Sequence, residues 1–331
     1  MAVLAAEPHP QLATGANRVP PFSHVFVIMM ENQGPSGLTP QDTPYLQQLM
    51  HRYGTDSAYY GVTHVSLPNY VATLAGTTGG THSDNPTQSF AGPTLASQLT
   101  RHHISWQAVM QSLPAPGYQG NWFPDNLPPS AGPATPPPNA LYAKKHDPFL
   151  LFPNLLPDRR QVVPLAALDQ ELASGRVPRF IWITPNLCND MHGQIPGPGN
   201  SCPESNPAAL LRRGDSFLAR LIPQITRSPA WTGNAAIFVT WDETGPFRLS
   251  HLAGYLSPGP AAPRFWGLPI GGGRVPLIVI SRTGPKPLHI ALWADHYSIL
   301  KTVEASWGLR FLGQARSSAV PVLSPFFAAP R

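Results

Sequence analysis

Four short, unbroken apolar runs are the feature that most constrains how this chain can fold. They cover residues 24–30, 179–184, 234–241 and 275–280. A strand has such a run when both of its faces are buried, as in a sheet covered by helices on both sides. Segments with helical periodicity lie between and after the runs, over residues 44–52, 68–74, 94–102, 165–173, 210–226 and 297–307. This alternation predicts an α/β fold with a largely parallel central sheet.

The rest of the chain has no boundary that would divide it into separate domains. Its 331 residues are enough for one elaborated domain, and no internal repeat is visible. Residues 1–22 are interrupted by prolines and lack periodicity, which predicts an N-terminal arm, and residues 23–331 are expected to form one domain. Within it, residues 114–138 are rich in proline and glycine. Loops of that length inside a domain tend to be functional, so we expect a loop or lid there.

The charge pattern limits the partners that the chain can have. The formal net charge is +5, charged residues make up 12% of the chain, and Lys and Arg never form a run longer than two. A mild, diffuse positive field favours a small anionic substrate and lacks the dense footprint of nucleic-acid binding. An ordinary solvated surface is the alternative explanation. No segment has the roughly 20 consecutive apolar residues of a membrane span, and nothing in the sequence indicates an oligomeric state.

The two cysteines, Cys188 and Cys202, fall in one polar stretch rich in Gly, Pro and Asn. A buried free cysteine prefers apolar surroundings, so the pair favours a disulfide. Two free thiols remain the alternative, and the spacing excludes a Cys-X2-Cys metal pair. A disulfide would indicate a secreted, periplasmic or cell-surface protein.

Polar side chains follow three of the apolar runs directly. Glu31 and Asn32 come after the first run, Asp190 and His192 come shortly after the second, and the pair Asp242-Glu243 follows the third. Open α/β sheets bind ligands beyond the carboxyl ends of their strands, so these groups are expected to meet in one crevice. Solvated strand-end acids, a loop histidine and a helix cap are the alternative explanations.

Carboxylates that are brought together repel one another unless a cation neutralises them. The oxygen-rich set Glu31, Asn32, Asp242 and Glu243 suits a hard divalent cation. Zinc or a similar metal suits a second set, which consists of Asp190, His192 and a further imidazole from His296. For His296 alone, a helix cap is the alternative explanation. Because two-metal sites are common in phosphate-ester cleavage, we expect one or two divalent ions, zinc, magnesium, manganese or calcium.

Ser66 is the candidate nucleophile. It lies just before the helical segment that starts at Pro68, where unpaired N–H groups and the helix dipole stabilise a phosphate. A metal would lower the pKa of the hydroxyl without a histidine base, and Asn69 is expected to donate a hydrogen bond to a phosphoryl oxygen. A plain N-cap serine is the alternative. The sequence has no Gly-X-Ser-X-Gly elbow, P-loop or dinucleotide glycine pattern.

These segments, taken together, resemble a known family. In order along the chain, the motifs resemble those of the bacterial phosphoesterase family of acid phosphatases and phospholipases C. The resemblance runs from Ser23 to Leu309 and implies a fold similar to alkaline phosphatase, a three-layer sandwich. It rests on residues 24–32, 64–70, 145–149, 185–192, 240–243 and 296–304.

The resemblance implies roles for individual residues. Glu31, Asn32, Asp242 and Glu243 become metal ligands, and Ser66 becomes the residue that is phosphorylated during turnover. The Ser66-Leu-Pro-Asn69 segment also resembles nucleotide pyrophosphatases. Through that wider comparison the second metal site takes Asp190, His192 and His296. His146 matches a family histidine near the substrate, which implies that it protonates the leaving alcohol.

The chain departs from the long phospholipases C after Asp242-Glu243, where it lacks their Gly-Gly and Asp-His-Val segments. This favours the phosphatase-like branch, and His251 is a candidate to replace a missing ligand. The hypothesis is a metal-dependent phosphomonoesterase that acts on a small anionic phosphate ester through a phosphoserine on Ser66. A phosphodiesterase or phospholipase C with the same site, and a non-catalytic secreted anion-binding protein, are the alternatives.

Overall fold

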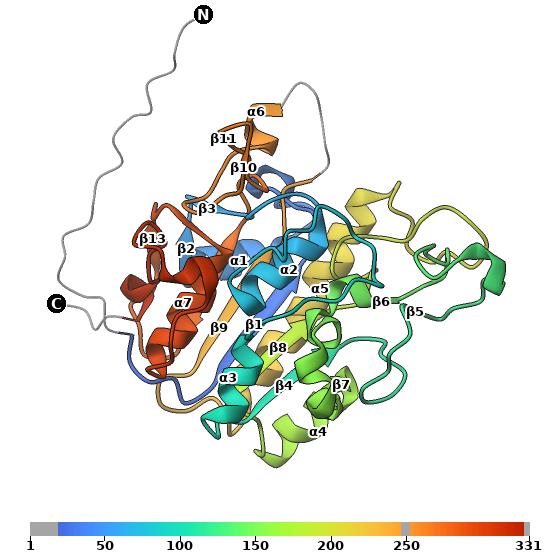
Figure 1. The fold of residues 1–331 in the computed structure, drawn as a ribbon. Coiled ribbons are helices and arrows are strands. Elements are labelled where there is room, and N and C mark those ends of the chain that lie inside the picture. Colours follow the sequence, from blue (N-terminus) through green and yellow to red (C-terminus); the bar gives the residue numbers. More distant parts are fainter. Residues whose placement is uncertain (1–18, 246–251, 328–331) are drawn as a thin grey trace, which may run out of the picture.

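A twisted eight-stranded sheet forms the centre of the protein (Figure 1). The computed structural model describes residues 19–245 and 252–327. The strands follow the order β13-β2-β12-β9-β1-β8-β4-β7. Their bounds are β1 Val25–Met30, β2 Gly54–Asp56, β4 Trp106–Met110, β7 Val162–Pro164, β8 Phe180–Thr184, β9 Ala236–Trp241, β12 Leu277–Ser281 and β13 Leu288–Ile290.

Neighbouring strands of the sheet run parallel except in the two pairs that involve β12. This confirms the prediction of an α/β fold with a largely parallel sheet. The fourth apolar run is the exception, because it forms the antiparallel strand β12 between β9 and β2. The central strands β1, β8 and β9 are mutually parallel, so their carboxyl ends lie at one edge of the sheet.

Helices cover both faces of the sheet, as the unbroken apolar strands require. In Figure 1, α2, α3 and α7 lie in front of the sheet, and α1 packs against α5 behind it. All six residues of β1 are buried, which is the result of helices on both sides. The helices are α1 Pro44–Arg52, α2 Ser66–Ala75, α3 Leu95–Arg101, α4 Leu165–Ser174, α5 Pro207–Arg227, α6 Leu252–Tyr255 and α7 His296–Ser306.

Smaller elements complete the described part of the chain. Three two-stranded ribbons pair β3 with β14, β5 with β6, and β10 with β11. Their bounds are β3 Tyr59–Tyr60, β5 Trp122–Phe123, β6 Tyr142–Ala143, β10 Arg264–Phe265, β11 Leu268–Pro269 and β14 Ala294–Asp295. Short 3-10 helices cover Pro35–Gly37, Pro129–Ala131, Lys144–His146, Pro148–Leu151, Pro153–Gln161, Gly313–Arg316 and Ser324–Phe326.

The two irregular regions expected from the sequence differ from each other in the structure. Residues 1–18 of the expected arm lie outside the described residues, whereas Phe22 is fully buried against the Phe238 and Phe327 rings. The insertion at residues 114–138 contains β5, which pairs with β6 just beyond it. It is therefore anchored to the domain by a ribbon at its base.

The predicted disulfide between Cys188 and Cys202 is confirmed. The two Cα atoms are 5.5 Å apart, both side chains are buried, and the bridge closes the loop that follows β8. Replacing both cysteines with serine is expected to lower the free energy of unfolding by about 3 kcal/mol, because the unfolded chain regains the loop's entropy. Urea denaturation of the double variant and the oxidised parent measures the difference. Equal unfolding free energies would contradict the expectation.

Candidate active site

Three carboxylates meet at the sheet edge where β9, β1 and β8 end. Glu31 directly follows β1, Asp242 directly follows β9, and Asp190 lies in the loop after β8. Backbone hydrogen bonds hold these ends together: Glu31 N–H donates to the Asp190 carbonyl at 2.8 Å, and Asp242 N–H donates to Met30 at 3.0 Å. The adjacent parallel strands therefore bring the acids to the same edge of the sheet, as expected from the sequence.

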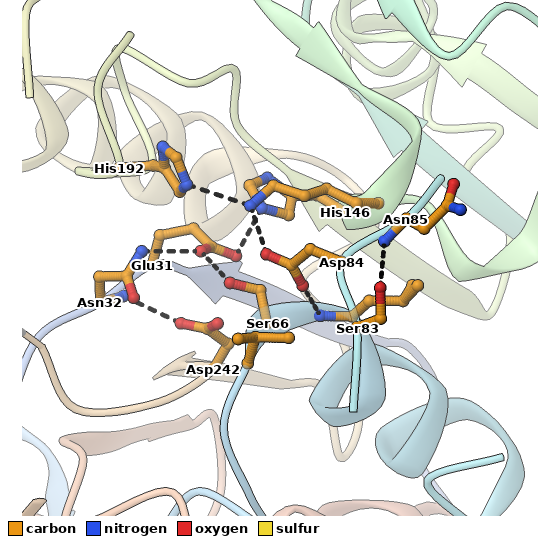
Figure 2. Close-up of polar contacts among 12 residues, drawn as sticks. Glu31, Asn32, Ser66, Ser83, Asp84, Asn85, His146, His192 and Asp242 are labelled. Carbon is orange, nitrogen blue, oxygen red and sulfur yellow. Dashed lines mark hydrogen bonds and ion pairs between the residues drawn. The ribbon is translucent and has the colours of Figure 1, made fainter. Parts of the chain in front are cut away.

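Ser66 points into this cluster from the first residue of α2 (Figure 2). Its hydroxyl donates a hydrogen bond to Glu31 Oε2 at 2.9 Å, and the side chain is 2% exposed. The N-cap residue of α2 is Val65, and no side chain caps the helix. The plain N-cap explanation for Ser66 is therefore wrong, since its hydroxyl is used on a carboxylate instead of the helix backbone.

The carboxylates are held in an environment that disfavours their charge. Burial first, and then the charges of Asp242 and Asp190, raise the pKa of Glu31 well above its ordinary value. Burial, followed by the charge of Glu243, raises the pKa of Asp242 to about 8. Burial also raises the pKa of Asp190 well above its ordinary value. Three such groups that influence one another electrostatically form a site whose charge a cation would neutralise.

Several buried polar atoms of the cluster make no hydrogen bond. They are Asp242 Oδ2, Asp190 Oδ2 and His146 Nε2. Buried polar atoms without partners are costly unless an ion completes them. Ligand atoms of Glu31, His146 and His192 also lie within 4.8 Å of one another. The donor set of carboxylate oxygens and imidazole nitrogens fits one or two divalent cations.

His146 lies deeper in the cluster than a proton donor to a leaving group requires. Its Nε2 is 3.3 Å from Glu31 Oε1, its Nδ1 is 3.5 Å from Asp190 Oδ2, and its ring stacks on Tyr70. Burial, and then the charges of Lys145 and His192, lower its pKa well below the ordinary value. An imidazole between two carboxylates suits a metal ligand, and the proton-donor role of His146 stays a prediction.

His192 lies beside Glu31 and His146, and one of its ring nitrogens carries a lone pair. Its Nδ1–H donates to the Gly193 carbonyl at 2.8 Å, and its Nε2 accepts from Lys145 Nζ at 3.2 Å. Burial, and then the Lys145 charge, lower the pKa of His192 to about 4. With Nδ1 protonated, Nε2 carries the only lone pair of the ring, so a metal would bind there in place of the hydrogen bond from Lys145.

Asn32 is tied to two of the carboxylates. Its backbone N–H donates to Asp242 Oδ1 at 2.9 Å, and its Nδ2 donates to Glu31 Oε2 at 3.2 Å. Its φ of 57° lies in the left-handed region, which asparagine tolerates better than most residues. Asn32 thus orients the acids whether or not its own oxygen binds a metal.

Glu243 is paired with a histidine that the sequence analysis did not single out. Its carboxylate contacts His64 Nδ1, and His64 Nε2–H donates to the Tyr255 carbonyl at 2.8 Å. Burial works to lower the pKa of His64, but the hydrogen bond and charge of Glu243 outweigh it, so the net shift is upward. The contact with Glu243 thus favours the protonated form of the His64 imidazole.

Asn69 has a different role from the one expected. Its Oδ1 accepts from the N–H groups of Val62 and Thr63 at 2.9 and 3.1 Å. Its Nδ2 donates to the carbonyls of Thr63 and Val65 at 2.7 and 2.9 Å. A carboxamide has two donor hydrogens and two acceptor lone pairs, so none is left for a phosphoryl oxygen. Asn69 instead shapes the loop that delivers Ser66.

His296 likewise does not point a free nitrogen at the site. Its Nε2–H donates to the backbone carbonyl of Asp242 at 2.6 Å, and its Nδ1 accepts from the Tyr59 hydroxyl at 3.0 Å. Asp295, and not His296, caps α7. The helix-cap explanation for His296 is therefore wrong, and both of its ring nitrogens have hydrogen-bond partners other than the carboxylates of the cluster. It positions the chain segment that carries Asp242.

Replacing His296 with alanine is expected to lower the free energy of unfolding by about 3 kcal/mol, because two buried partners lose their hydrogen bonds. The bound metal content should stay near that of the parent, since no ligand is removed. Urea denaturation and elemental analysis of the same preparation measure the two quantities. Loss of one equivalent of metal from a folded variant would restore His296 as a ligand.

Four residues at the site carried no role in the sequence analysis. Tyr70 donates to Glu31 Oε1 at 2.6 Å, and Lys145 Nζ donates to Asp84 Oδ2 at 2.8 Å. Asp84 Oδ1 accepts the backbone N–H of Leu67 at 2.9 Å, so it occupies the start of α2 (Figure 2). Tyr70, Lys145 and His64 lie inside the motif segments, whereas nothing in the sequence marked Asp84. His251 lies outside the described residues.

The sequence model of the Phosphoesterase family matches residues 30–310, so the chain belongs to that family. It is 26% identical over 265 residues to a phosphate-repressible acid phosphatase of Penicillium chrysogenum, covering 77% of this chain and 52% of that one. It is 25% identical over 315 residues to a phosphatidylinositol-3-phosphatase of Mycobacterium tuberculosis, covering 95% and 86%. The chain thus spans about half the length of the first of these relatives.

Among solved structures, an alkaline phosphatase superfamily protein from Vibrio parahaemolyticus has a TM-score of 0.56 at 12% identity, covering 91% of this chain and 71% of that one. This confirms the alkaline phosphatase-like fold, and the family model confirms the family resemblance inferred from the motifs. Within residues 19–245 and 252–327, no helix is long and apolar enough to cross a membrane.

Proposed function

We propose that this protein is a metal-dependent phosphomonoesterase that uses Ser66 as its nucleophile. The observation that carries the proposal is the Ser66 hydroxyl, hydrogen-bonded at 2.9 Å to Glu31 within a cluster of three buried carboxylates. Family membership and two phosphatase relatives, one an acid phosphatase, support a phosphate ester as the substrate.

Glu31 and Asp242 would hold a cation beside Ser66, and His146, His192 and Asp190 would hold a second one or complete the first. The unpaired atoms Asp242 Oδ2, Asp190 Oδ2 and His146 Nε2 are the ones it would complete. When bound, such a cation lowers the pKa of an adjacent hydroxyl and polarises a phosphoryl oxygen. Glu243 could also bind the cation, but its carboxylate already contacts His64 Nδ1 and would have to bind both.

The chain's own residues then carry out a double displacement. Ser66 Oγ attacks phosphorus while its proton passes to Glu31 Oε2, the ester P–O bond breaks, and the alcohol leaves. Lys145 keeps its hydrogen bond to Asp84, and with His192 Nε2 on the cation the other hydrogens of Lys145 are free; one of them passes to the departing oxygen, so that the alcohol leaves neutral. Water then attacks phosphorus, the P–O bond to Ser66 breaks, Ser66 Oγ takes back the proton held by Glu31, and a proton of the water restores Lys145.

The test is hydrolysis of p-nitrophenyl phosphate and its bis ester by protein that is stripped of metal and reloaded with zinc, magnesium, manganese or calcium. We expect the monoester to be cleaved at least tenfold faster, and only after reloading. Faster cleavage of the bis ester would assign a phosphodiesterase or phospholipase C. No cleavage with any of the metals would favour a non-catalytic anion-binding protein.

We also propose that the protein works outside the cytoplasm. The buried disulfide Cys188–Cys202 supports this, because disulfides persist in oxidising compartments. Fractionation of the source cells should place the protein in the periplasm, at the surface or in the medium, and a cytoplasmic pool with reduced thiols would contradict the proposal.

A further inference from the structure

A pocket of about 390 Å³ opens beside the carboxylate cluster. Its walls come from four segments: the loop after α2, the insertion at residues 114–138, the 3-10 helix Lys144–His146, and the loop that follows β8. The lining residues on which the argument depends are Trp122, Pro136, Pro137, Lys145, His192 and Ile195.

The inner end of the pocket is polar and is shared with the active site. Lys145 Nζ lies 2.8 Å from Asp84 Oδ2 and 3.2 Å from His192 Nε2, and all three residues line the pocket. Asp84 Oδ1 accepts from the N–H of Leu67, the residue after Ser66 (Figure 2). The polar end of the pocket therefore lies one hydrogen bond from the start of α2, the helix whose first residue is Ser66.

The pocket also has a large apolar lining. It includes Trp122, Pro136, Pro137, Leu187 and Ile195. Trp122 is buried, and its indole N–H donates to the Pro133 carbonyl at 3.2 Å, which fixes the ring. Aromatic and proline rings present faces on which a flat apolar group packs well.

The walls are fixed to each other before any substrate arrives. Gln194 Nε2 donates to the Ala140 carbonyl at 2.8 Å, and its Oε1 accepts from Ser201 N–H at 2.7 Å. This side chain therefore joins the end of the insertion to the loop closed by the disulfide Cys188–Cys202. A preformed pocket binds its ligand without a large ordering cost.

We propose that this pocket receives the leaving group of the substrate, and that the preferred substrates are phosphate monoesters of aromatic or other flat apolar alcohols. The inference rests on the proposed function, because it assigns the group that departs from phosphorus at Ser66. Lys145 meets the departing oxygen at the inner end, and the ring packs between the Trp122 and Ile195 walls. A small polar alcohol would leave these apolar faces uncovered.

The test compares 1-naphthyl phosphate with phenyl phosphate, two esters that release a phenolic oxygen but differ in ring area. Ile195→Ser removes apolar wall and leaves the catalytic residues in place. We expect it to lower the ratio of kcat/KM for the naphthyl over the phenyl ester by about tenfold. The matched control is Ile290→Ser, which alters a half-buried isoleucine in β13, outside the pocket, and should leave the ratio unchanged.

The outcomes separate the two proposals. An unchanged ratio in Ile195→Ser, with both esters still turned over, would overturn the leaving-group pocket and leave the phosphatase intact. If neither ester is hydrolysed, the proposed function fails. Calorimetry with non-hydrolysable 1-naphthylphosphonate then still tests the pocket: binding that weakens about tenfold in Ile195→Ser supports it, and equal binding overturns it.

Discussion

Replacing Ser66 with alanine is expected to lower kcat for p-nitrophenyl phosphate by at least about 10³-fold, because the attacking oxygen is lost. The fold should survive, since Ser66 caps no backbone group of α2. Glu31 also keeps its hydrogen bonds from Tyr70 and Asn32. Steady-state kinetics, with circular dichroism and elemental analysis of the same preparation, measure activity, fold and metal content.

Ser36→Ala is the matched control, because it removes an exposed hydroxyl from the same edge of the molecule. It should have parental kcat. Activity of Ser66→Ala within tenfold of the parent would remove Ser66 as nucleophile, whereas inactivity with loss of metal would assign it a ligand role only.

Removing the metal is expected to make stability depend strongly on pH. Burial raises the pKa of Asp242 to about 8 in the folded protein, against an ordinary value near 4 in the unfolded chain. The folded state therefore binds more protons between these values, and its stability is highest at low pH and falls as pH rises toward 8. The chelated protein should melt at a lower temperature at pH 8 than at pH 5.

Asp242→Asn sharpens this test, because its effects on activity and on stability have opposite signs. The amide oxygen can still accept the Asn32 N–H, but the buried charge is gone. At pH 8 the metal-free variant should be more stable than the metal-free parent by about 3 kcal/mol. Its activity should fall at least 100-fold, because a ligand is lost.

Asp169→Asn provides the control, since Asp169 is exposed on α4 and its replacement should change neither quantity. Denaturation curves at pH 5 and pH 8, with and without chelator, measure the effect. If the metal-free parent is as stable at pH 8 as at pH 5, the claim that these buried carboxylates need a bound cation is contradicted.

The sheet could be predicted from the sequence where burial makes a strand uniformly apolar. That condition holds for β1, β8 and β9, whose carboxyl ends position the acids. It fails for β4, because Gln107 interrupts the run and hydrogen-bonds Glu171. It also fails for β2, because this strand has only three residues, Gly-Thr-Asp, and none of them has a large apolar side chain.

The acids of the site could be predicted because they are adjacent to strand ends, and their clustering follows from parallel pairing. The roles of Asn69 and His296 could not. The expected roles were assigned from residue type alone. In the structure Asn69 hydrogen-bonds the backbone of Thr63, and His296 hydrogen-bonds the backbone of Asp242. Asp84 was missed because its position depends on the path of a loop, which no sequence period determines.

The most direct test of the central claim is a rapid acid quench of the metal-loaded protein during turnover of a phosphate monoester, followed by peptide mass analysis. The account predicts one phosphorylated peptide, with the phosphate on Ser66, that is absent from Ser66→Ala and from the chelated protein. Steady turnover without any phosphate on Ser66, or phosphate on another residue, would contradict it.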